Sequence, residues 1–372
     1  MKLRSVAAAP ALAVALVATA FPLTAQTPQA KPPVAVYWMS VETAARTGLE
    51  IPPRAGTPAP PAPQGGKRMR LELGSSRVPN GVPRATHAIP PELMLGERLP
   101  LVPPARDRTA AAPEVVPGEP EAARPRGRVL IYWGCGETVR PGQPVIVDFS
   151  KLDAKAAARA YRTAKVLRPA GPAPGRHRAY GMWPNQESQQ RLPEAASLRG
   201  MHFVSGNYTP DIQFSIEERH DFLQPVEFLP VTRSESGMHL LNWKAVPNAI
   251  GYFAAAMARG ENAGETIVWT SSELQEAGSA LLDYLPPVEV ERLIKEKIVL
   301  PPQVNSCMVP AGVFKGLAAV LNFIAYGDDL DLMHPPRPRD PKALWEPQWS
   351  LKVRRKSTAT TLLGEQATPN TQ

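Results

Sequence analysis

Residues 237–272 form the most regular stretch of the chain. Three short runs rich in apolar, β-branched and aromatic residues follow one another there, and two sets of turn residues separate them. Such runs, the first of them alternating with a period of two residues, are typical of strands, and Pro, Gly and Asn favour tight turns. The stretch therefore predicts three consecutive strands. The runs are 239–243, 251–257 and 266–269, with turns at 246–248 and 259–262.

Proline extends this expectation to the rest of the chain. It supplies 44 of the 372 residues, whereas aromatic residues make up only 6%. Because proline lacks an N–H group and interrupts helices, this composition favours short strands joined by rigid loops over a helical bundle. Two stretches, 50–66 and 79–126, carry so much Pro and so little apolar bulk that we expect them to be disordered loops.

Other strand patterns lie in the first half of the chain. Residues 69–73 alternate, which predicts that Met69, Leu71 and Leu73 face inward. Residues 129–133 and 145–149 flank a Pro- and Gly-containing turn and predict a hairpin. The Tyr-Trp pair at 37–38 is repeated at 132–133, so we expect these two strands to be neighbours in one sheet.

The second half includes a pattern that resembles a known module. Trp243 lies in one predicted strand, and the sequence Pro247-x-Ala249-x-Gly251-Tyr252 leads into the next. This arrangement is similar to the second and third strands of fibronectin type III modules, and the resemblance implies an immunoglobulin-like β-sandwich but no activity. Two helical patterns, 273–284 and 287–297, depart from that family and are interpreted as an insertion.

We therefore expect a mainly β protein built from two β-sandwich-like domains. The stretches YWGCGE (132–137) and AYGDD (325–329) resemble those of a group of secreted proteobacterial proteins, and this resemblance implies no activity. The expected organisation is a signal peptide at 1–25, an N-terminal β-rich domain at 31–225, a fibronectin-III-like domain at 226–357 with a helical insertion at 273–297, and a disordered tail at 358–372.

The first residues predict export. A short basic head, 1–4, precedes an Ala-, Val- and Leu-rich run at 6–23, and small residues follow at the expected cleavage point before Gln26. This is the pattern of a secretory signal peptide, with an uncleaved membrane anchor as the alternative. We expect the mature chain to be periplasmic or extracellular, without a transmembrane segment.

The two cysteines, Cys135 and Cys307, allow two interpretations. In an exported protein they can form a disulfide between the two halves of the chain, or they can remain two buried thiols. A third interpretation makes Cys135, within Gly-Cys-Gly, the nucleophile of an exported hydrolase with a site between the domains. A reactive thiol needs a positioned base, and the six histidines are scattered, so we favour a structural role.

No other motif points to catalysis. The chain lacks His pairs at metal-binding spacing, a Gly-x-Ser-x-Gly motif and a phosphate-binding loop. Asp328, Asp329 and Asp331 form a cluster without the spacing of a calcium loop and are interpreted as a solvated turn. We expect no catalytic residue, no metal and no cofactor, and a non-enzymatic envelope protein with a binding or scaffolding role.

Charge indicates which partners to expect. The net charge is +8, and a basic run occupies 352–356. Export and the scarcity of aromatics argue against nucleic acid, which leaves anionic envelope components, such as lipid or polysaccharide, or another envelope protein. The alternative for the basic run is an exposed edge strand, where Lys and Arg block unwanted pairing. The aromatic residues that could line a groove are expected in the core instead. They are Tyr132, Trp133, Trp243, Tyr252 and Trp269.

Overall fold

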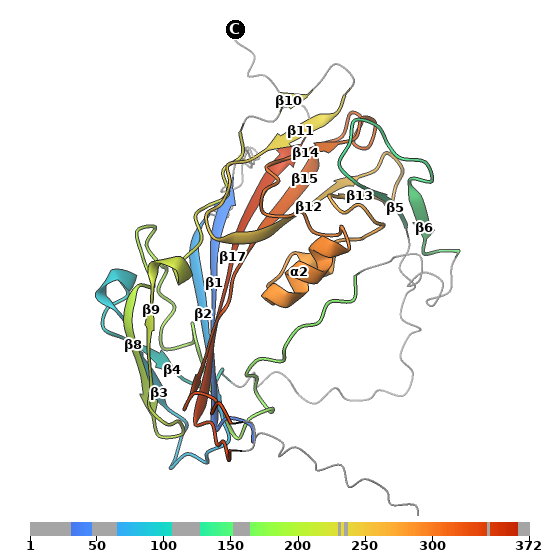
Figure 1. The fold of residues 1–372 in the computed structure, drawn as a ribbon. Helices are drawn as coiled ribbons and strands as arrows, with labels where there is room; N and C mark the ends of the chain where they lie inside the picture. The colour runs from blue at the N-terminus through green and yellow to red at the C-terminus, as the bar shows by residue number, and fades with distance from the viewer. Residues whose placement is uncertain are drawn as a thin grey trace, which may run out of the picture.

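The computed structural model is mainly β, and its strands form one large sheet and two small ones (Figure 1). It describes residues 31–46, 65–105, 127–151, 164–229, 232–233, 237–340 and 343–363. The expected signal peptide at 1–25, most of the loop at 50–66 and the end of the tail lie outside the described residues. Among those that are described, no helix has both the length and the apolar character needed to cross a membrane.

The large sheet has ten strands, and most of them follow the order β6-β5-β13-β12-β15-β17-β1-β2-β7, with β16 pairing to β17. They are β1 (Ala35–Arg46), β2 (Gly66–Ser75), β5 (Arg128–Trp133), β6 (Val145–Asp148), β7 (Ala179–Trp183), β12 (Ala249–Arg259), β13 (Glu265–Thr270), β15 (Ala319–Gly327), β16 (Leu330–His334) and β17 (Trp349–Leu363).

β17 is the strand that joins the two halves of the chain. On one side it runs parallel to β1 over the whole length of β1, from the pair Ala35 and Trp349 to the pair Arg46 and Thr360. On its other side it pairs first with β16 and then with β15. In Figure 1 the blue β1 and the red β17 lie side by side. The sheet therefore runs across the boundary that we expected between residues 225 and 226.

The two small sheets cover parts of one face of the large sheet. The first has the order β4-β3-β8-β9 and encloses a core around Tyr37, Met39 and Leu71. The second has the order β10-β11-β14 and packs over Leu321 and Phe323. Their strands are β3 (Ala85–Ala88), β4 (Arg98–Leu101), β8 (Gly200–Gly206), β9 (Ile212–Ile216), β10 (Thr232–Arg233), β11 (His239–Asn242) and β14 (Ser306–Val309).

The opposite face has its own apolar cluster at one end. There α2 (Pro287–Lys295) and the residues before it pack on Phe253 and Ile324. Figure 1 shows α2 and the sheet containing β8 and β9 on opposite sides of the long strands. The short helices of the described chain are η1 (Pro91–Leu93), η2 (Glu218–His220) and η3 (Ser279–Leu281).

Most strand patterns are confirmed, and the exceptions have physical causes. β11, β12 and β13 occupy the three predicted runs, β5 and β6 form the predicted hairpin, and α2 occupies most of 287–297. The helix expected at 273–284 is wrong apart from η3. Gly278 adopts a φ of 87°, and its N–H donates to the Glu276 carboxylate, so local hydrogen bonds replace those of a helix. The two strands that share Tyr-Trp lie in one sheet but are not neighbours.

Two segments expected to be disordered contain regular structure. Within 79–126, residues 85–101 form β3, η1 and β4, because Leu93, Leu99 and Leu101 are buried and supply a core despite the prolines. Pro91 starts η1, and Pro100 lies on β4, the edge strand, where a missing N–H costs little. Residues 358–363 continue β17, since Thr favours strands, β15 pairs along the whole segment and β1 pairs with residues 358–360. Residues 106–126 and 364–372 lie outside the described part.

Candidate functional site

The side of β2 that faces away from β1 is only partly paired. β2 and β1 pair from Gly66 to Ser75, but β7 covers only Leu71 to Ser75. β7 ends at Trp183, and Pro184 follows, which has no N–H with which to continue the ladder. Within the described chain, the backbone of residues 66–70 thus lacks a neighbouring strand on this side. Half-paired strands of this kind present free N–H and C=O groups.

A groove of about 860 Å³ lies along this unpaired edge. Among the described residues, its lining includes four basic side chains and no carboxylate, over an apolar base that contains Met69 and Trp183. The segment 189–192 faces β2 across the groove. A pocket of this volume is within the usual range for ligand sites, which is roughly 300–1,000 Å³. The basic residues are Lys67, Arg68, Arg70 and Arg191.

The arginines of β2 stay half exposed. Arg70 lies 3.0 Å from the carboxylate of Glu72, and Arg68 lies 3.7 Å from that of Glu42, while their side chains keep 51% and 52% of their surface exposed. Burial opposes a rise in the pKa of Arg70, but the Glu72 carboxylate raises it above the ordinary value. Both guanidinium groups therefore keep half of their surface accessible to a further anion.

Lys67 is held more firmly at one end of the groove. Its Nζ donates to the carbonyl of Ala196 at 2.6 Å and lies 5.1 Å from the centre of the Phe222 ring. Burial lowers the pKa of Lys67, and the carboxylates of Asp221 and Glu194 partly offset that effect. Arg191 lies on the opposite wall and is exposed.

The basic run at 352–356 belongs to the same sheet but is not an exposed edge, so that interpretation is wrong. Arg354 and Lys356 lie opposite Ser40 and Glu42 of β1, which in turn lie opposite Arg70 and Arg68. These side chains therefore share one face of the sheet. Arg355 points to the other face, is buried, and donates to the carbonyls of Asp328 and Asp221.

The charges of this run are engaged within the protein. The guanidinium of Arg354 lies 4.8 Å from the ring of Trp38 and 4.5 Å from that of Tyr284. Lys356 also approaches the Tyr284 ring, at 4.5 Å, and lies 3.6 Å from the Asp283 carboxylate. Intramolecular partners thus compensate much of the basic run, whereas the groove beside β2 keeps accessible positive charge.

The acidic turn of residues 328–331 is only partly solvated. The Asp329 side chain is 5% exposed and lies 2.9 Å from Nζ of Lys352, whereas Asp331, on the same lysine, is 62% exposed. Burial raises the pKa of Asp329 even though Lys352 opposes it. The expectation of a solvated turn is therefore wrong for Asp329. Within the described residues, no group of three or more His, Cys, Asp and Glu side chains is placed to hold a metal ion.

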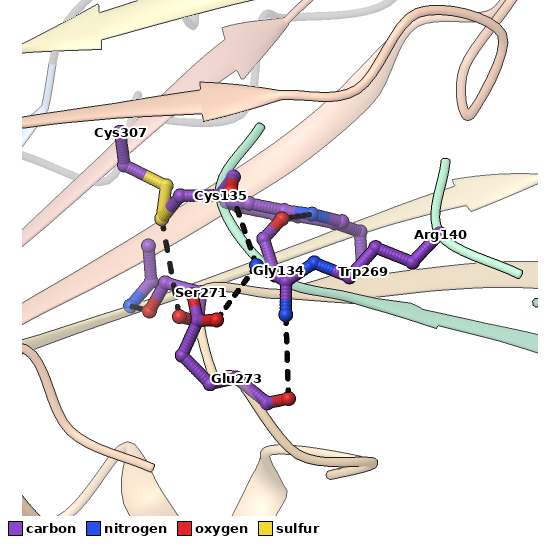
Figure 2. Close-up of a disulfide and its surroundings, with 8 residues drawn as sticks. Gly134, Cys135, Arg140, Trp269, Ser271, Glu273 and Cys307 are labelled. Carbon is purple, nitrogen blue, oxygen red and sulfur yellow. Dashed lines mark hydrogen bonds and ion pairs between the residues drawn. A yellow bond between two sulfur atoms is a disulfide. The ribbon is translucent and has the colours of Figure 1, made fainter. Parts of the chain in front are cut away.

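Cys135 and Cys307 are joined in a disulfide with an S–S distance of 2.08 Å (Figure 2). The bond connects the segment after β5 with β14, so it links the large sheet to the three-stranded one. Around it, Arg140 donates to the carbonyl of Cys135 and forms an ion pair with Glu273. A thiol nucleophile at Cys135 would require this bond to be reduced.

The aromatic residues that we expected in the core lie there to different degrees. Trp243, Tyr252 and Trp269 are fully buried, while Tyr132 and Trp133 are half-buried beside the disulfide segment. The three buried rings therefore pack the core beneath the three-stranded sheet and do not line a groove.

A buried chain of hydrogen bonds in the first half was not predicted. The Tyr37 hydroxyl lies 2.8 Å from Nδ1 of His87, whose Nε2 lies 2.9 Å from Nδ1 of His202. Nε2 of His202 donates to the carbonyl of Leu198 at 2.7 Å, which makes its Nδ1 an acceptor. With both imidazoles neutral, Nε2 of His87 therefore donates to Nδ1 of His202, and the Tyr37 hydroxyl donates to Nδ1 of His87. The three residues are far apart in the sequence, so no local spacing could reveal them.

The groove was also missed, although it left a signal in the sequence. Residues 66–72 read GKRMRLE, and the alternation was interpreted only for its apolar members. The same alternation places Arg68 and Arg70 together on the other face. Arg191 comes from a distant segment that has no strand pattern, so its position opposite β2 could not be predicted.

Comparisons with known proteins give no relative for this chain: no family model, no curated protein and no solved structure matches it.

Proposed function

We propose that this protein is a non-enzymatic binding protein of the cell envelope that holds an anionic partner in the groove beside β2. The observation that carries the proposal is a volume of about 860 Å³ at one edge of the sheet, whose described lining residues include four basic side chains and no carboxylate. Positive potential in a concave site attracts and orients anionic partners.

Export is part of the proposal and rests on the basic head and apolar run of residues 1–25. Envelope surfaces carry anionic lipids and polysaccharides, and envelope proteins carry acidic segments, so an exported protein meets suitable partners there. Cell fractionation followed by N-terminal sequencing tests this part. We expect a periplasmic or secreted chain that begins at Gln26, and a full-length chain in the cytosol would contradict export.

Binding by the groove is tested with the purified mature chain and three fluorescent or sedimentable probes. These are an acidic peptide, a sulfated oligosaccharide and vesicles that contain phosphatidylglycerol. We expect at least one probe to bind with an affinity that falls as salt rises, because ion pairs at an exposed site are screened. Charge reversal in Arg68→Glu/Arg191→Glu is expected to weaken that binding by about tenfold or more.

A matched control separates the groove from the overall charge. The variant Arg259→Glu/Lys315→Glu changes the net charge by the same amount at two exposed positions outside the groove. We expect it to bind nearly as well as the unmodified protein. Equal losses in both variants, or no binding of any probe, would reject the groove as the binding site.

A further inference from the structure

We infer that the partner in this groove is an extended acidic peptide that adds a strand to the free edge of β2. The inference rests on the proposed function, because it names the ligand of the same groove. It is carried by two features found together, which are the backbone of residues 66–70, unpaired on this side within the described part of the chain, and the positive charge around it.

The backbone edge favours a peptide over other polyanions. In a strand, N–H and C=O groups point alternately to the two sides, so a five-residue edge offers groups to a new neighbour as well as to β1. An added strand satisfies those groups with its own main chain, which is the usual mode of strand addition. A polysaccharide or a lipid headgroup could pair with the basic side chains. It would not form the main-chain hydrogen bonds that the backbone of residues 66–70 offers.

The side chains of β2 specify what kind of strand fits. Arg68 and Arg70 lie on one face, and Met69 lies on the other, where it is only 4% exposed. Side chains directly opposite on neighbouring strands lie about 4.5–5.5 Å apart between their Cβ atoms. Carboxylates on alternate residues of the added strand would therefore meet the two arginines.

The other face of the added strand would meet a surface that is apolar around Met69 and has Lys67 at one end, where its Nζ already donates to the Ala196 carbonyl. Leu192 packs against the core beside Met69, and Trp183 closes the groove where β7 ends. Alternate apolar residues of the peptide would lie here. The fitting ligand is thus a segment of about five residues in which Glu or Asp alternates with Val, Ile or Leu, a pattern that is itself typical of strands.

The first experiment compares three fluorescein-labelled peptides by anisotropy. The first has the alternating sequence Glu-Val-Glu-Val-Glu, and the other two carry N-methyl groups on the amides of one edge or of the other edge. All three have the same charge and side chains, and the two methylated peptides differ in which edge has lost its N–H donors. We expect methylation of one edge to weaken binding about tenfold or more, and methylation of the opposite edge to have little effect.

The second experiment locates the peptide by amide hydrogen exchange on the full mature chain. The amides of residues 66–70 that point away from β1 are expected to exchange fast in the free protein and to be protected when the unmethylated peptide is bound. Those that pair with β1 serve as the internal reference, because they should be protected in both states.

The outcomes separate this inference from the proposed function. Edge-dependent binding with protection of residues 66–70 supports strand addition. Equal binding of both methylated peptides overturns strand addition, even if the groove binds acidic probes. Protection of amides outside residues 66–70 overturns it as well. Groove-dependent binding of the sulfated oligosaccharide or of the vesicles without binding of the peptide also overturns it and leaves the proposed function intact. If no probe binds, both proposals are rejected.

Discussion

Arg354 donates a hydrogen bond from Nε to Oγ of Ser40, 2.6 Å away, although 314 positions separate the two residues in the chain. They lie opposite one another in the parallel pair of β1 and β17. The same guanidinium lies over the ring of Trp38 and over that of Tyr284. One side chain thereby ties the first strand, the last strand and the segment before α2 together.

Replacing Arg354 is expected to destabilise the fold. Arg354→Ala removes one hydrogen bond and two cation–ring contacts, which together correspond to about 1–3 kcal/mol of unfolding free energy. Arg354→Lys keeps the charge but loses the guanidinium group that contacts both rings and Ser40, so it should retain only part of this free energy. Unfolding in guanidinium chloride measures the effect, with the exposed Lys315→Ala as the control. A loss of unfolding free energy in Arg354→Ala that is no larger than the loss in Lys315→Ala would contradict this prediction.

The ion pair of Asp329 and Lys352 is expected to contribute more to the unfolding free energy than the neighbouring pair of Asp331 and Lys352. Lys352→Met leaves the Asp329 carboxylate buried without its partner, which should cost about 2–5 kcal/mol. Asp331→Asn changes an exposed partner of the same lysine and should cost less than about 1 kcal/mol. The double variant Asp329→Asn/Lys352→Met should regain most of the loss. A double-mutant cycle by chemical unfolding checks this, and additive effects would refute the coupling.

The buried histidines predict that stability decreases in acid. Burial lowers the pKa of His202 to about 4, and burial together with His202 lowers the pKa of His87 well below its ordinary value. The unfolded chain binds these protons below about pH 6.5, whereas the folded chain does not, so the unfolding free energy should fall as pH falls from about 6.5 toward about 4. The expected loss from His202 alone is about 2–3 kcal/mol.

Unfolding curves at several pH values between 7.5 and 4.5 measure this dependence. The variant His87→Gln/His202→Gln cannot take up these two protons, so it should be less stable at neutral pH but should show a shallower decrease in acid. The same slope in the variant and the unmodified protein would show that other groups cause the decrease.

Two buried tyrosines of the same core are expected to respond in opposite ways to loss of their hydroxyl group. Within the described residues, Tyr208 Oη is buried and has no hydrogen-bond partner, whereas the Tyr37 hydroxyl lies 2.8 Å from Nδ1 of His87. Tyr208→Phe removes an uncompensated polar atom and should leave stability unchanged or raise it by up to about 1 kcal/mol. Tyr37→Phe should cost about 1–3 kcal/mol, because it leaves a buried acceptor unpaired. Thermal unfolding of both variants measures these changes in stability. A destabilised Tyr208→Phe would contradict the prediction and indicate that the Tyr208 hydroxyl has a hydrogen-bond partner.

Much of the strand content could be predicted because alternation is a local property. Met69, Leu71 and Leu73 are buried as predicted, although Glu72 of the other face is buried as well, and Leu241 and Trp243 are buried together with His239. Local patterns failed where tertiary contacts override propensity. The pattern of residues 273–284 predicts a helix, but Gly278 and the buried Glu276 carboxylate form local hydrogen bonds instead. The Pro-rich residues 85–101 form strands because their leucines are buried in a core.

By itself, the sequence determined which residues face the interior in clearly alternating strands such as 69–73, because the backbone period of two residues sets this within a few positions. Only the tertiary structure decided that β17 lies between β1 and β15, and that Asp329 pairs with Lys352 and Arg354 with Ser40. It also decided that Arg191 lines the groove together with β2. The physical reason is that pairing between distant strands depends on the free energy of the whole core. The groove and its accessible charges exist only once that pairing has been made.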